Sequence, residues 1–205
     1  MKIRYLGLVA YEPTWRAMQA FTQSRGPRTA DELWLLEHPP VFTLGLAGRS
    51  EHVLAPGDIP VIRTDRGGQV TYHGPGQAVA YVLADLRRME IGVKRLVDRL
   101  EGAVIAVLDG YGLRGERRPG RPGVYVNERK VAAIGLRVAR GCSYHGLALN
   151  AHLDLAPFSR IDPCGYAGLE STSLALLGVR DSIDGVERRL AAALASALAP
   201  AAAVA

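Results

Sequence analysis

The strand-like segments of this chain gather in the middle of the sequence, whereas the helical segments lie before, between and after them. Runs typical of strands occupy residues 2–9, 32–37, 61–63, 69–72, 78–86, 124–126, 131–138 and 144–151. Apolar residues recur at helical spacing over residues 12–24, 93–109 and 182–198. Because helices and strands do not alternate strictly, the pattern favours an α+β fold, with a mixed or antiparallel β-sheet flanked by helices, over a doubly wound parallel sheet.

One domain of residues 1–205 is the simplest organisation for this chain. The sequence contains no internal repeat and no low-complexity linker. Residues 112–123, which are rich in Gly, Arg and Pro, are the only candidate for a long flexible loop, and they are too few to separate two domains. A chain of 205 residues buries roughly 70% of its unfolded surface, so its core needs neither disulfides nor a structural metal.

The chain has two cysteines, Cys142 and Cys164, which excludes a disulfide scaffold and a zinc ribbon with two cysteine pairs. Such low cysteine usage fits a reducing cytoplasm. Residues 1–12 contain no apolar stretch of signal-peptide length, and residues 190–205 are too short and too rich in alanine for a membrane span. We therefore expect a cytoplasmic protein with no membrane partner.

The formal net charge of +5 permits an acidic partner without identifying one. A basic nucleic-acid-binding module is an alternative on charge alone. However, the basic residues are dispersed apart from residues 114–121, and aromatic residues are only 6% of the chain, so we expect no nucleic-acid partner. The basic residues comprise 22 arginines and only three lysines, so each of Lys2, Lys94 and Lys130 is a candidate for a role that arginine does not fill.

Residues 66–77, RGGQVTYHGPGQ, form the densest cluster of glycine and polar residues in the sequence. The four glycines allow a ligand to approach the main chain closely, and their N–H groups can form a nest for an anion or oxyanion. A tight hairpin whose glycines only satisfy positive φ angles is the alternative. The segment is neither a GxGxxG nor a Walker A sequence, so it carries no nucleotide-binding fingerprint.

Cys164 lies in DPCG, residues 162–165, where proline and glycine exclude an interior helix or a central strand. A loop cysteine is accessible, as a nucleophile must be, although free cysteines are more often buried and inert. Cys142 leads into an apolar strand pattern, so we expect it to pack inertly. A metal site from Cys142, His145 and His152 is disfavoured because their spacing matches no zinc pattern.

Lys130 opens the strand-like run KVAAIGLRV directly after an Asn-Glu turn. A lysine at a strand end usually just protects the edge of a sheet. A functional role is favoured here by the scarcity of lysine and because a thiol needs a nearby cation to be nucleophilic at neutral pH. Residues 144–150, YHGLALN, indicate a core strand with one satisfied histidine, His145.

These segments together resemble the lipoyl(octanoyl) transferases, a family with the biotin/lipoate protein ligase fold. The matching stretches occur in one order over most of the chain: LWLLEHPPVFTLG (33–45), RGGQVTYHGPGQ (66–77), GVYV followed by KVAAIG (123–135), HGLALN (145–150), DPCG (162–165) and TSL (172–174). No single stretch is decisive, but the ordered set that includes DPCG is highly specific. Tyr125 departs from the family pattern, which has tryptophan there as often.

The resemblance implies an octanoyl transfer through a covalent thioester, without a cofactor. Cys164 would attack the octanoyl thioester on acyl carrier protein, and Lys130 would lower the pKa of the thiol and shuttle the proton. The acceptor would be a lysine of a lipoyl domain, in 2-oxoacid dehydrogenase complexes or in the glycine cleavage H protein. The substrate-binding residues implied are Arg66, Gly67, Gly68, Gln69, Val70, Thr71, Tyr72, His73, Ala133, Ile134, Gly135, Gly146, Leu147 and Ala148.

Two other enzymes fit parts of this pattern. An ATP-dependent lipoate ligase on the same fold activates the free acid as an adenylate and needs no nucleophilic cysteine, so Cys164 in DPCG disfavours it. A cysteine hydrolase differs from a transferase only in whether water or a lysine amine discharges the acyl-enzyme.

Overall fold

Two β-sheets organise the chain, and the computed structural model describes residues 1–162 and 169–199. The larger sheet contains β1 (Lys2–Leu8), β2 (Glu32–Glu37), β6 (Gln77–Leu83), β9 (Cys142–Asn150), β8 (Arg129–Ala139) and β7 (Gly123–Val126), in that order across the sheet. The smaller sheet contains β4 (Val61–Arg63), β3 (Val41–Leu44) and β5 (Val70–His73). The helices are α1 (Tyr11–Ser24), α2 (Val93–Asp109), α3 (Ile183–Ala197) and two 3-10 turns, η1 (Ser50–His52) and η2 (Ala156–Arg160).

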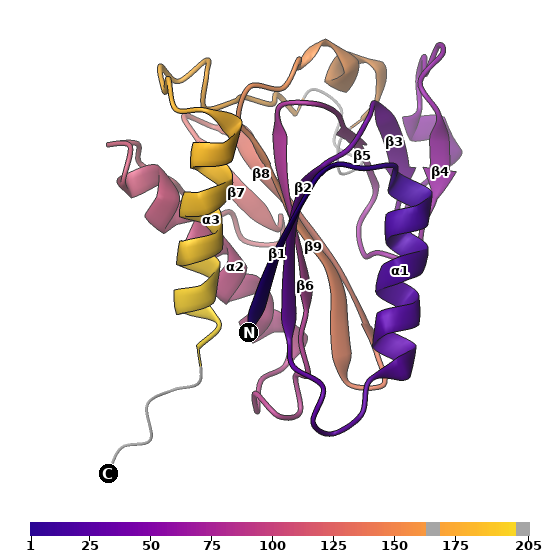
Figure 1. Ribbon diagram of the computed structural model, residues 1–205. Helices are drawn as coiled ribbons and strands as arrows, with labels where there is room; N and C mark the ends of the chain where they lie inside the picture. The colour runs from indigo at the N-terminus through magenta and orange to yellow at the C-terminus, as the bar shows by residue number, and fades with distance from the viewer. Residues whose placement is uncertain (163–168, 200–205) are drawn as a thin grey trace.

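Helices cover both faces of the larger sheet (Figure 1), and its central strands β2, β6 and β9 are buried along almost their whole length, whereas the edge strand β1 is mostly exposed. Leu33 and Leu35 of β2 face a core that includes the buried side of α2 and α3, whereas Trp34 and Leu36 face a second core with Met18 of α1. Successive side chains of a strand point to opposite faces, so a strand covered on both sides is apolar throughout. In the described residues, no helix is long and apolar enough to cross a bilayer.

The strand pairing confirms the expected α+β fold with a mixed sheet. β1 pairs parallel with β2, whereas β2, β6, β9, β8 and β7 pair antiparallel in succession. In the smaller sheet, β3 pairs parallel with β4 and antiparallel with β5. The smaller sheet and α1 both lie on the side of the larger sheet that is opposite α2 and α3 (Figure 1).

The sequence pattern missed one strand. β3 has four residues, all buried, and follows directly after Pro39 and Pro40. A short, fully buried strand shows no alternation of polar and apolar residues, so its periodicity gives no signal. The glycine-rich residues 112–123 are irregular, as expected, but the main chain of Glu116 is held by two hydrogen bonds to Tyr125.

Gly146 is required where β9 lies against β6. A Cβ atom at this position would lie 2.0 Å from the main-chain oxygen of Ala80, which is a backbone atom and has no freedom to move aside. Forced overpacking of this kind costs about 1–3 kcal/mol. We expect Gly146→Ala to lower the Tm by about 2–12 °C in a thermal melt, because each kcal/mol shifts a domain of this size by about 2–4 °C.

Gly26 provides the matched control for this substitution. A Cβ atom there meets nothing within 4 Å, and its φ angle is not in the left-handed region. Gly26→Ala should therefore melt within about a degree or two of the parent protein. Equal melting temperatures for both variants would show that β6 and β9 are less tightly apposed than described.

Candidate active site

A cavity of about 760 Å³, including its open mouth, lies between the larger sheet and β5 of the smaller one. Small residues create this space on two neighbouring strands. Ala133 of β8 pairs with Ala148 of β9, and Gly135 pairs with Gly146, so these paired positions carry almost no side-chain volume. The apolar lining and the few polar groups around it are typical of a small-molecule site.

Most of the residues implied by the sequence resemblance surround this one cavity. Those that line it are Arg66, Gly68, Gln69, Val70, Thr71, His73, Lys130, Ala133, Ile134, Gly135, Gly146, Leu147 and Ala148. Of the other described residues in this set, Tyr72 and Gly67 do not line it. Tyr72 packs against Phe42 and Phe158, and Gly67 holds the loop in place, because its N–H donates to the main-chain oxygen of Leu136.

Lys130 is buried at the edge of the cavity, with only 5% of its surface exposed. Its Nζ donates a hydrogen bond to the main-chain oxygen of Pro122 at 3.1 Å and lies 5.4 Å from the centre of the Tyr125 ring. Gly123 leaves room for this side chain, since a Cβ there would lie 3.1 Å from Cε of Lys130. Lys130 is therefore a buried amine that can take part in chemistry at the cavity, and it is not a solvated residue that protects the edge of a sheet.

The main chain on both sides of Lys130 is paired with the segment that follows the undescribed stretch. The N–H of Lys130 donates to the oxygen of Glu170, and the N–H of Thr172 donates to the oxygen of Lys130. Cys164 itself lies outside the described residues. Of the residues that flank that stretch, Asp162 is held by a hydrogen bond from its N–H to the main-chain oxygen of His52.

Arg66 fastens the glycine-rich loop to the smaller sheet. Its guanidinium donates to the oxygen and hydroxyl of Thr43 on β3 and to the main-chain oxygens of Gly67 and Gln69. The loop therefore has a defined shape around an arginine that is 8% exposed. This rigidity suits a binding loop, because less ordering is needed when a ligand arrives.

A chain of hydrogen bonds links the smaller sheet to the segment beside Lys130. The ring of His73 bonds to the Gln77 side-chain oxygen at 2.7 Å, and the amide of Gln77 donates to Asn150 at 3.0 Å. The amide of Asn150 then donates to the main-chain oxygen of Thr172 at 3.0 Å. These hydrogen bonds fix the positions of β5, β6 and β9 relative to one another and to the segment that contains Thr172.

Asp65 organises another side of the cavity. Its carboxylate accepts hydrogen bonds from Tyr144, His145, Trp15 and Gln19. Burial raises the pKa of Asp65, but these donors outweigh burial and hold the pKa well below its usual range. His145 was expected to be a satisfied core histidine. Its Nε2 is bonded to Asp65, but its buried Nδ1 has no partner in the described part of the chain.

Buried histidines make the stability of this protein depend on pH. Burial above all lowers the pKa of His38 to about 4 and of His73 to about 3, and it also lowers the pKa of His145. The unfolded chain takes up protons on these residues near pH 6.5, whereas the folded chain does not. Stability therefore falls with falling pH, by up to about 1.4 kcal/mol per pH unit for each histidine.

Glu187 acts in the opposite direction over the same range. Burial raises the pKa of its carboxyl to about 7, so the folded chain binds this proton first and gains stability as pH falls. We expect urea unfolding to take up almost no protons at pH 7, where Glu187 offsets the histidines, and about one to two protons at pH 5. His38→Gln should reduce that uptake by about one proton, and a flat profile would contradict this assignment.

The sequence pattern missed several residues of the cavity. These are Tyr11, Gln77, Val79, Tyr81, His145, Asn150, Phe158 and Ser171. Gln77, His145 and Asn150 lie within segments that had been singled out, so only their roles were missed. Tyr81 lies in an expected strand and Tyr11 lies one residue before the expected helix, and neither pattern distinguishes a cavity wall from a core. Among the described residues, no group of three or more potential metal ligands occurs.

Comparison with known proteins agrees with the resemblance seen in the sequence. The family model for the lipoyl protein ligase A/B catalytic domain matches residues 10–195. Octanoyltransferases of Alkalilimnicola ehrlichii and Thiobacillus denitrificans are 60% and 59% identical, over 93% and 96% of this chain and 89% and 90% of theirs. A bi-partite lipoate protein ligase from Thermoplasma acidophilum, described with its E2 lipoyl domain, superposes with a TM-score of 0.77. It is 17% identical and covers 96% of this chain and 83% of its own, so the likeness concerns the fold alone.

Proposed function

The chain belongs to the lipoyl protein ligase A/B catalytic domain family and is an octanoyltransferase, and from this premise we propose that it works through a thioester on Cys164 with Lys130 as proton carrier. We also propose that residues 1–205 form one catalytic domain in the cytoplasm. The observation that carries the proposal is the burial of Lys130 at the cavity, paired through its main chain with the segment that follows Cys164.

The cavity has the chemistry that an octanoyl chain needs. Val79, Ile134, Leu147 and Phe158 contribute apolar side chains to its lining. Burial of each methylene of an acyl chain contributes about 0.8 kcal/mol, so a medium-length chain gains several kcal/mol there. We assign the substrate-binding role to the lining residues of the loop at 66–73 and of strands β8 and β9. Gly67 and Tyr72 support this lining from outside the cavity.

The reaction balances in two steps. In the first step, the Cys164 thiolate attacks the octanoyl thioester, a new carbon–sulfur bond forms, and the donor leaves as a thiol after taking the proton held by Lys130. In the second step, the acceptor amine attacks the octanoyl-enzyme, an amide forms, and Cys164 leaves as a thiolate. Lys130 accepts the surplus proton of the amine. No cofactor takes part in either step.

The proposed donor and acceptor are those that the sequence resemblance implies. We propose octanoyl acyl carrier protein as the donor and a lysine of a lipoyl domain as the acceptor, in 2-oxoacid dehydrogenase complexes or in the glycine cleavage H protein. The ligase from T. acidophilum was described with an E2 lipoyl domain, which supports the choice of acceptor. The positive net charge of this chain favours encounter with acidic partners.

Intact-mass spectrometry tests the proposed function directly. After incubation with octanoyl acyl carrier protein alone, the enzyme should gain one octanoyl group, and the modified peptide should contain Cys164. Addition of a lipoyl domain should move that group to a lysine of the domain without ATP. Modification that requires ATP and free octanoate would instead identify a ligase, and release of free octanoate would identify a hydrolase.

A further inference from the structure

A second cavity lies at the far end of α1 from the acyl cavity, and its lining is rich in arginine. Arg25 at the end of α1, Arg87 and Arg88 after β6, and Arg140 in the turn between β8 and β9 all line it. Tyr11, which lines the acyl cavity, lies 14 residues before Arg25, so α1 separates the two sites by about 20 Å. The two cavities share no lining residue in the described part of the chain.

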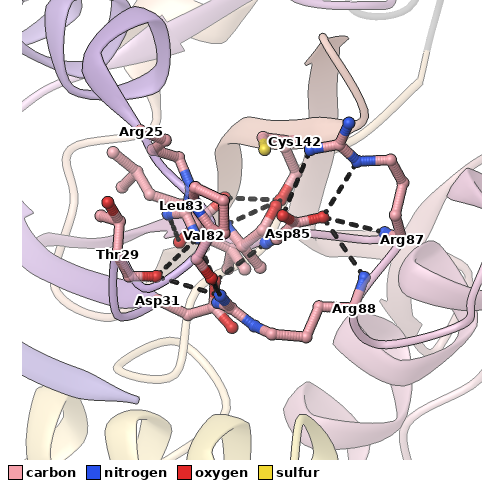
Figure 2. A network of polar contacts seen from close by, with 12 residues as sticks. Arg25, Thr29, Asp31, Val82, Leu83, Asp85, Arg87, Arg88 and Cys142 are labelled. Atoms are coloured by element: carbon pink, nitrogen blue, oxygen red, sulfur yellow. Dashed lines mark hydrogen bonds and ion pairs between the residues drawn. The ribbon is translucent and has the colours of Figure 1, made fainter.

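Two aspartates pair with three of these four arginines (Figure 2). Arg25 and Arg88 both pair with the single carboxylate of Asp31. Arg87 pairs with Asp85, which also accepts the main-chain N–H groups of the residues after it. Arg140 donates to a main-chain oxygen of α1 and has no carboxylate partner in the described residues. Four arginines against two aspartates leave two positive charges at the cavity.

Two residues that line this cavity carry buried polar atoms without hydrogen-bond partners among the described residues, and both atoms can donate. In the described chain, three buried side-chain nitrogen or oxygen atoms lack a partner, and two of them, Thr22 Oγ1 and Arg25 Nε, belong to residues that line this cavity. Thr22 is 3% exposed, and the side chain of Arg25 is 4% exposed. Buried polar groups without partners are rare in folded proteins and require an explanation. An anion with several acceptor oxygens would supply the missing partners.

The backbone is shaped to hold one of these arginines in place. The side chain of Arg87 lies across Gly141, where a Cβ would be 2.6 Å from Cδ and Nε of Arg87. Gly141 has a φ of +76°, a conformation that side chains rarely adopt, so the turn both requires glycine and leaves room for the guanidinium. Asp85 holds the same guanidinium from the other side, with two contacts of 3.3 Å.

We propose that this cavity is a binding site for a phosphate group, separate from the site of octanoyl transfer. A dianion matches the surplus of two charges, and its oxygens can accept from the guanidinium groups and the threonine hydroxyl. Arginine suits this ligand because its planar fork of donors matches the geometry of phosphate oxygens. The cavity has the dimensions of a small ligand, which favours a phosphate or phosphate ester over a flat protein partner.

The test measures binding of inorganic phosphate to the intact protein, with chloride at matched ionic strength as the reference. At a concentration about 100 times its Kd, phosphate should raise the Tm by about 5–10 °C. Arg140→Gln, which removes the arginine without a carboxylate partner, should weaken calorimetric phosphate binding about tenfold. Arg114→Gln is the matched control, because the Arg114 side chain is 91% exposed and does not line the cavity.

Thr22→Val is a second variant, for which we expect an unchanged or higher Tm without phosphate and a smaller rise in Tm with phosphate. Without phosphate it should melt at or above the parent temperature, because it removes a buried hydroxyl that lacks a partner. When phosphate is added, the Tm of Thr22→Val should rise less than the Tm of the parent protein. A purely structural role for this residue predicts no loss of phosphate binding.

Two further ligands identify the source of the phosphate group. Glycerol phosphate that binds as well as inorganic phosphate would point to an esterified ligand, whereas binding of inorganic phosphate alone would point to the free ion. The proposal is overturned if phosphate raises the Tm no more than chloride does. It is equally overturned if phosphate raises the Tm of Arg140→Gln as much as that of the parent protein. It is also overturned if an oligoglutamate peptide binds better than phosphate. None of these measurements depends on octanoyl transfer.

Discussion

Replacing Cys164 with alanine should lower the rate of octanoyl transfer by roughly 10⁴-fold or more, since removal of a nucleophile that acts together with a proton carrier has effects of about that size. The variant should also gain no octanoyl mass when it is incubated with the donor alone. The loss follows because no other group in the proposed reaction forms the thioester. The variant should therefore lose transfer activity and the octanoyl mass gain together.

The second cysteine of the chain is the natural control. Cys142 is buried, as expected, with 3% of its surface exposed, and its thiol lies 3.8 Å from the main-chain oxygen of Arg140 and close to the Arg87 guanidinium. Cys142→Ala should retain most of the transfer activity and still gain the octanoyl mass. Normal transfer by Cys164→Ala would exclude the thioester intermediate and favour direct attack by the acceptor amine.

Replacing Lys130 should separate two roles that the mechanism gives to one amine. Two unit charges about 4 Å apart at an effective dielectric near 20 interact by roughly 4 kcal/mol, which is enough to lower the pKa of a neighbouring thiol by two to three units. Lys130→Arg keeps that charge but does not exchange protons at neutral pH. We expect it to lower transfer by about 10²–10⁴-fold, the usual contribution of general acid–base catalysis.

The alkylation rate of Cys164 distinguishes the two roles. Iodoacetamide should modify Cys164 in Lys130→Arg at nearly the parent rate and in Lys130→Met much more slowly, as measured on the isolated peptide. Lys94→Arg is the control, because Lys94 is exposed on α2. Since Gly123 leaves limited room beside Lys130, thermal melts should accompany each variant. Full turnover by Lys130→Arg would remove the proton-carrying role.

The helices were predictable because their ends carry local chemical signals. The expected helix over residues 93–109 matches α2 at both ends, where Gly92 precedes it and Gly110 follows it. The helix expected over 182–198 differs from α3 by one residue at each end, and Ser182 accepts the hydrogen bond of an N-cap. Glycines and caps act through the adjacent main chain, so their effect is visible in the sequence.

The strands and the cavity were less predictable because they depend on distant neighbours. β3 has no periodic signal, and the expected strand over 78–86 ends at Leu83. The hollow at the cavity arises only when Gly135 meets Gly146 across two strands, a pairing that no local pattern shows. Tyr72, whose contact with substrate stays a prediction, packs against Phe42 and does not line the cavity, because successive side chains of a strand point to opposite faces.

The pairing between Lys130 and the segment at 170–172 has an evolutionary consequence. Both hydrogen bonds join main-chain atoms only, so they are indifferent to which side chains the incoming segment carries. A lineage can therefore exchange the residues before this segment, including a reactive thiol, without changing this pairing. Transferases and ligases that share one scaffold can diverge in this way, and grafting the stretch into a ligase is a practical route to retrace that step.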